Sequence, residues 1–190
     1  MKKCLLWILM LAISLCACRQ TIQEGEIEES NGMDDADAPH LIALYKETDS
    51  LLMMGKMDIE KMQLFVDRAW DYAEKYPEDT LSPHFKFFVA IYEMKIAGSN
   101  PDEREAQQQY FHSIDHFDQL IEQYPDYVNL PYCYYYQGMI YENLHRISDA
   151  ESEYRELVHR YPDTELGKNI VEYLKVQGYA QSADDLRKKF

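Results

Sequence analysis

Apolar residues recur along much of this chain at intervals of three and four, which is the spacing of one face of an α-helix. The clearest stripes are Ile59, Met62, Val66, Ala69, Ala73 and Tyr76; Tyr110, Ile114, Phe117, Ile121 and Tyr124; and Ile147, Ala150, Tyr154, Leu157 and Tyr161. Each stripe ends in Tyr-Pro, and proline cannot continue a helix because it has no amide N–H and crowds the preceding turn. Almost no alternating strand pattern occurs beyond Pro39, so the sequence predicts an all-α fold.

A shorter apolar segment precedes each stripe. Residues 85–92 and residues 134–141 carry large apolar side chains three and four apart, and residues 41–52 show the same spacing more faintly. Gly55 marks a turn between the first segment and the first stripe. The order predicts about three helix pairs in a solenoid, where each pair buries its faces against its neighbours.

The chain after Pro162 predicts a closing element. Ile170 and Leu174 continue the helical spacing, and Gly178 suits the stop of that helix. Ser182 suits the N-cap of a short last helix. Such a capping element should have a polar outer side, because no further pair covers it.

The second helix pair is longer than the third. Residues 98–101, Gly-Ser-Asn-Pro, are typical of a turn, and Asp102 suits a helix start. We expect a longer loop in this pair, a longer second helix, or both.

The third pair carries a more specific pattern, with large, small and aromatic residues on its first helix and a small and a large residue on its second. These residues are Tyr134, Gln137, Gly138, Tyr141, Ala150, Tyr154 and the terminating Pro162. The pattern resembles the tetratricopeptide repeat. The Tyr-Pro-Asp ending also resembles that of the periplasmic tetratricopeptide lipoproteins, including the outer-membrane barrel-assembly lipoprotein and the Tol-Pal coordinator class. The resemblance covers about residues 40–178 and implies antiparallel helix pairs that bind a partner and carry no reaction chemistry.

The first residues have the pattern of an export signal. Two lysines, an apolar run over residues 5–15 and a small-residue cleavage site predict a signal peptide over residues 1–17. The apolar run is shorter than the ~20 residues of a spanning helix, which disfavours the alternative of a retained membrane anchor. Residues 15–18, Leu-Cys-Ala-Cys, resemble the bacterial lipobox and imply that Cys18 is the lipid acceptor. The alternative is an ordinary secreted protein.

Acidic residues dominate the next segment and the whole chain. Residues 18–39 hold many Glu and Asp with little apolar periodicity, which predicts a disordered tether before a folded domain over residues 40–190. An acidic segment of this kind also resembles a surface-export mark, although a plain solvated spacer is favoured. The net charge of −15 disfavours nucleic acid and anionic lipid surfaces as partners.

The family resemblance implies where a partner would bind. Repeats of this kind line a concave groove with fixed positions of their first helices. In this chain the matching residues are Tyr132, Tyr135, Met139, Glu142 and Asn143 in the third pair, and Lys86, Ala90, Glu93 and Met94 in the second. Tyrosine offers broad contact area and a hydroxyl, which suits a peptide or a sugar ring, but part of this cluster is also expected in the core.

No catalytic motif stands out in the sequence. Cys133 has no recognisable base near it and is expected to be a packed helix residue. His112 and His116 lie one helical turn apart, with Asp115 nearby, yet no motif fixes a third metal ligand. We therefore expect a solvated helix face there, with no metal, no cofactor and no enzymatic activity.

These patterns lead to two main hypotheses about function, and a hydrolytic or metal-dependent enzyme is a third and least favoured one. The first is an outer-membrane lipoprotein whose repeats dock an envelope protein or peptide, with outer-membrane protein assembly as one candidate process. The second is a glycan-binding accessory lipoprotein in nutrient capture, with tyrosines stacked on sugar rings. In both hypotheses the chain is attached through its lipid alone, on the periplasmic face or at the cell surface.

Overall fold

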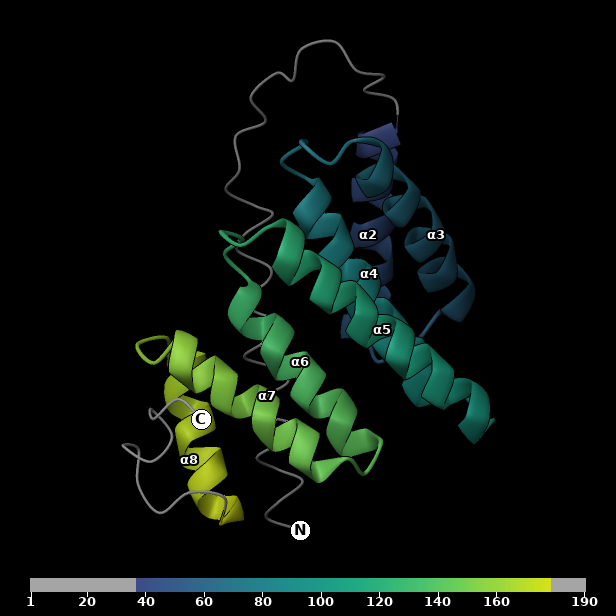
Figure 1. The fold of residues 1–190 in the computed structure, drawn as a ribbon. Coiled ribbons are helices and arrows are strands. Elements are labelled where there is room, and N and C mark those ends of the chain that lie inside the picture. Colours follow the sequence, from purple (N-terminus) through teal and green to yellow (C-terminus); the bar gives the residue numbers. More distant parts are fainter. Residues whose placement is uncertain (1–36, 179–190) are drawn as a thin grey trace. The chain divides into compact units, whose positions relative to one another are not determined.

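The computed structural model describes residues 37–178. All the regular structure in this range is helical, which confirms the all-α prediction (Figure 1). The helices are α2 (Asp37–Met53), α3 (Ile59–Lys75), α4 (Ser82–Ser99), α5 (Glu103–Gln123), α6 (Leu130–Asn143), α7 (Ile147–Arg160) and α8 (Glu165–Gln177). The predicted signal peptide, Cys18 and the Ser182 cap lie outside the described residues. None of the helices in this range combines the length and the apolar character that crossing a membrane requires.

The helices begin and end where the local sequence indicates. Asp58 and Asp102 cap α3 and α5, because each carboxylate accepts hydrogen bonds from backbone amides of the first turn. Gly178 ends α8 in the left-handed conformation, with φ of 81°, which glycine adopts without steric strain. The C-caps of α3, α5 and α7 are the tyrosines of the three Tyr-Pro pairs, Tyr76, Tyr124 and Tyr161.

The helices pack as successive pairs. α2 packs on α3, α4 on α5 and α6 on α7, while α8 closes the series against α7 and α6. The pairs are joined by contacts of α3 with α4 and of α5 with α6. The first helix of one pair also touches the first helix of the next, since α4 contacts α6. In the same way α6 contacts the closing helix α8. This is the predicted helix-pair solenoid with a closing helix.

The two kinds of helix differ in how they are buried. α3, α5 and α7 bury one stripe and leave the other face in water, as their apolar spacing predicts. α4 and α6 are apolar on almost every side and form the centre of the core. Ile59 and Ile147 are exceptions to the stripe prediction, because each starts its helix and is exposed.

The extra length of the second pair lies in a helix. α5 has 21 residues and is the longest of the described helices, while only residues 100–102 connect it to α4. Of the two expected forms, the longer second helix is therefore the one observed.

Candidate docking surfaces

Most residues of the predicted groove are packed inside the domain. Five of the nine are buried: Lys86, Ala90, Met94, Tyr135 and Met139. The other four are half-buried or exposed: Glu93, Tyr132, Glu142 and Asn143. The physical reason is that α4 contacts α3, α5 and α6, and α6 contacts α4, α5, α7 and α8. The prediction that these residues line an open groove is therefore wrong for the five buried ones. Binding by the other four stays a prediction.

Lys86 is a buried cation with several partners. Its side chain is 1% exposed, and its ammonium group forms an ion pair with Glu74 of α3. It also donates a hydrogen bond to Gln123 Oε1 of α5 at 2.8 Å. The ammonium nitrogen lies 4.4 Å from the centre of the Trp70 ring, a cation–π contact. Lys86 thus connects α4 to both neighbouring second helices and is not a surface charge.

Glu93 is engaged in a second contact between helices. His116 Nδ1 of α5 lies 2.6 Å from Glu93 Oε2, and the His116 ring stacks on Trp70 of α3 with centroids 3.9 Å apart. The expectation that both histidines lie on a solvated face is wrong for His116, because Trp70 and Glu93 cover it. His112 is exposed, as expected.

Glu142 on α6 is occupied in the same way. It accepts hydrogen bonds from the hydroxyl groups of Tyr173 on α8 and Tyr154 on α7. Burial raises the pKa of this carboxyl, and the two hydroxyl donors act against that rise. Its position favours a role in joining three helices.

The tyrosine cluster is largely part of the core. Tyr134, Tyr135 and Tyr136 are buried, and their ring faces lie among neighbouring aromatic residues. A sugar ring can stack only on an exposed aromatic face. These three residues therefore give no support to the glycan hypothesis.

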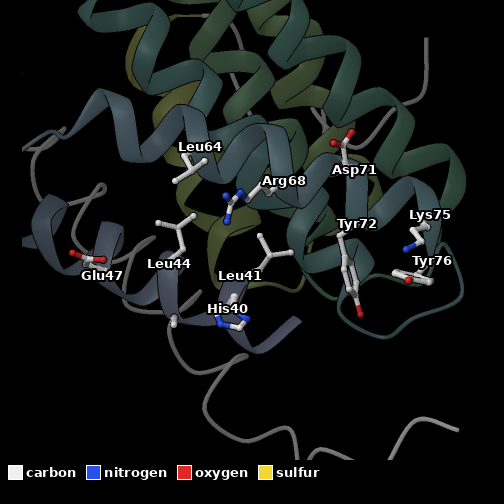
Figure 2. Close-up of a pocket in the computed structure, with 11 residues that line it drawn as sticks. His40, Leu41, Leu44, Glu47, Leu64, Arg68, Asp71, Tyr72, Lys75 and Tyr76 are labelled. Carbon is white, nitrogen blue, oxygen red and sulfur yellow. The ribbon is translucent and has the colours of Figure 1, made fainter. Parts of the chain in front are cut away.

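An open groove lies instead between α2 and α3, with a volume of about 660 Å³ (Figure 2). Leu41 and Tyr72 form a buried floor, and Leu44 is half-buried. Leu64 is 40% exposed on the other wall, although it is a large apolar side chain. Figure 2 shows Arg68 extending from α3 toward Leu41 and Leu44 of α2.

Charged side chains form the rim of the groove. Arg68 and Lys75 come from α3 and are exposed, as is Asp71 between them. Glu47 lines the α2 side, where it is ion-paired with Lys61. None of the sequence patterns predicts this groove; the signal in the sequence that points to it is Leu64, an apolar residue outside the buried stripe of α3.

The geometry of these surfaces can be set beside known proteins. No family model and no curated protein matches this chain. The resemblance to tetratricopeptide lipoproteins therefore stays a prediction.

A polar cluster also lies where α5, α6 and α7 meet. Gln137 Nε2 of α6 donates a hydrogen bond to Asp118 Oδ1 of α5 at 2.6 Å. Burial raises the pKa of Glu153 on α7 to about 7, and the nearby carboxylates of Asp118, Glu156 and Asp149 add to the rise. This carboxyl therefore titrates near neutral pH.

Proposed function

We propose that the chain is a bacterial lipoprotein, anchored through Cys18 in the outer membrane, whose helical domain is a protein–protein interaction adaptor of the cell envelope. Its partner is an envelope protein or a peptide segment, and outer-membrane protein assembly is one candidate process. Its resemblance to periplasmic tetratricopeptide lipoproteins motivates the choice of compartment and fold family.

The observation that carries the proposal is the open groove between α2 and α3. It combines an apolar floor with a charged rim, which is the composition of grooves that bind helical peptide segments. Leu64 lies in the wall beside this apolar floor, so a partner that covers the groove also buries this side chain.

A photo-crosslinking residue in place of Leu64 tests the adaptor function in the native bacterium. We expect a discrete protein adduct, identified by mass spectrometry. The matched control is the same crosslinker at Gln108, an exposed position on α5 outside the groove. Absence of an adduct at Leu64, or identical adducts at both positions, would reject the adaptor function proposed for this groove.

The membrane anchor is tested separately. Cys18→Ser should move the protein from the membrane fraction to the soluble fraction, because the lipid acceptor is lost. Cys16→Ser is the matched control, which should leave the protein in the membrane fraction. If Cys18→Ser also stays with the membrane, the proposed lipid attachment is wrong.

A further inference from the structure

α3 packs on one face of the second helix pair, which α4 and α5 form. The side chains in this contact show what the corresponding face of another pair can bind. Trp70 and Glu74 of α3 lie one helical turn apart and point at α4 and α5. Trp70 stacks on His116, while Glu74 forms an ion pair with Lys86. Lys86 also bonds to Gln123, so α5 takes part in the same contact. An aromatic residue and a carboxylate therefore seat one helix on the next pair.

The groove between α2 and α3 is the corresponding face of the first pair. His116 and Arg68 each stand eight residues before the Tyr of a Tyr-Pro pair, and Gln123 and Lys75 each stand one residue before it. Arg68 and Lys75 line the groove. Within residues 37–178 no helix precedes α2, so this stretch of chain provides no equivalent of α3 for the first pair.

The charge of the groove differs from that of its counterpart. The second pair has His116 and Gln123 where the first has the cations Arg68 and Lys75. On the α2 wall, Glu47 is already ion-paired with Lys61, which leaves Asp71 as the other acid of the rim. Asp71 offsets part of this charge, but Arg68 and Lys75 still make the rim more positive than the His116 and Gln123 positions, which favours a partner with negative charge.

We propose that this groove binds an acidic amphipathic helix of a partner protein, one that presents an aromatic residue followed by a carboxylate one turn later. The aromatic ring lies against Leu64 and Arg68, the counterpart of His116, and the carboxylate meets Lys75, the counterpart of Gln123. This inference rests on the proposed adaptor function and specifies the chemistry of its partner.

A second copy of this chain fits the groove less well. In the last pair, Arg155 and His159 of α7 stand at the same distances before Tyr161 as Trp70 and Glu74 stand before Tyr76. Arg155 is already ion-paired with Glu151 on its own helix, and α8 packs on α7, so a second copy presents no aromatic and acidic pair of this kind to Arg68 and Lys75. Charge complementarity therefore favours a different protein as the occupant.

Binding of a labelled helical peptide to the whole mature chain tests this inference. The probe is a side-chain-stapled peptide with the sequence of residues 59–75 in which Lys61→Glu makes the helix more acidic; it contains the Trp70 and Glu74 pair, and fluorescence anisotropy measures its Kd. We expect saturable binding that weakens at least tenfold for the protein variant Arg68→Glu. Arg104→Glu, at an exposed position of α5, is the matched control and should change Kd less than twofold. A probe with Glu74→Lys should also bind at least tenfold more weakly.

Several outcomes would overturn the inference. One is no saturable binding, and another is equal weakening by Arg68→Glu and Arg104→Glu. A third is binding only after residues 19–36 are deleted, which would make the acidic segment of this chain the occupant. A fourth is self-association in sedimentation that Arg68→Glu abolishes, which would make a second copy the occupant.

The peptide result and the crosslinking result can fail independently. If the peptide binds as expected but the crosslinker at Leu64 gives no adduct, the groove chemistry stands and the adaptor function fails. If the crosslinker captures a partner whose contact segment is neither helical nor acidic, the adaptor function stands and this inference fails.

Discussion

Gly138 allows α6 and α7 to approach each other closely in the third pair. A Cβ atom at this position would lie 2.3 Å from Cε1 and 2.7 Å from Cδ1 of the Tyr154 ring. Real side chains do not tolerate such distances, and the ring is buried and cannot swing away. The small residue is therefore required by the position of α7 against α6.

Gly138→Leu should lower the free energy of unfolding by about 3 kcal/mol, because overpacking forces the two helices apart. Thermal or urea denaturation followed by circular dichroism measures this change. The control Ser152→Ala, at an exposed position of α7, should stay within about 0.5 kcal/mol of wild type. Equal stability of Gly138→Leu and wild type would show that α6 and α7 do not pack in this register.

Glu153 should make the stability depend on pH near neutrality. Its pKa in the folded protein is about 7 and its ordinary value is 4.5, so between these values the folded state binds more protons than the unfolded chain. The free energy of unfolding contributed by this group therefore falls as the pH rises through this window. The loss is complete above the folded-state pKa and amounts to about 2 kcal/mol after allowance for solvent screening.

Glu153→Gln should remove this contribution, since the amide stays neutral at every pH. Urea denaturation at pH 5 and pH 8 measures the difference. At pH 8 we expect the variant to have a higher free energy of unfolding than wild type. At pH 5 we expect this difference to disappear. Glu122→Gln, an exposed position of α5, serves as control; if both variants show the same pH dependence, the burial of Glu153 is not its cause.

At the scale of the elements, α4 is held by polar contacts that cross its apolar surroundings. Lys86 is buried, but its partner Glu74 is 51% exposed. Removing Glu74 therefore leaves a buried cation with only Gln123 and the Trp70 ring, whereas removing Lys86 leaves an acid that water can reach. The two substitutions should differ in their effects.

Glu74→Ala should destabilise the protein by about 2 kcal/mol, and Lys86→Met should be closer to neutral because methionine fills a similar volume without a charge. Chemical denaturation of both variants and of the double variant gives the coupling between the two residues. A larger loss for Lys86→Met than for Glu74→Ala would contradict the view that the buried cation depends on its carboxylate.

The elements themselves could be predicted from the sequence, because their causes are local. The stripes, the aspartate caps at Asp58 and Asp102, and the Tyr-Pro ends define the helices without reference to distant residues. Contacts between helices could not be predicted in the same way. Lys86 and His116 are polar and were expected at the surface. Trp70 from another helix covers both side chains, and their polar partners Glu74 and Glu93 also come from other helices. The α2–α3 groove depends in the same way on how two helices sit together.

At the scale of the whole described domain, one aromatic residue joins the second pair to the third. Tyr136 of α6 stacks on Phe117 of α5 with an interplanar angle of 9°, and its ring centre lies 6.2 Å from that of Phe87 on α4. In a solenoid each pair is stabilised mainly by its neighbours. When the interface between two pairs is weakened, the helices on one side of it therefore open before the rest. Together with the hydrogen bond from Gln137 to Asp118, Tyr136 therefore couples α6, α7 and α8 to the rest of the described helices.

Tyr136→Ala should let the third pair open separately from the first two. Truncation of a buried aromatic residue costs about 3 to 5 kcal/mol, and this loss falls at the junction. Hydrogen exchange measured by mass spectrometry should show faster exchange in α6–α8 than in α3–α5. Tyr45→Ala is the matched control at the other junction, where the Tyr45 ring lies 4.3 Å from that of Phe88, and it should accelerate exchange mainly in α2 and α3. Uniform acceleration in all the described helices by either variant would mean that they unfold as one cooperative unit, because local loss of an interface would then be transmitted along the whole series of pairs.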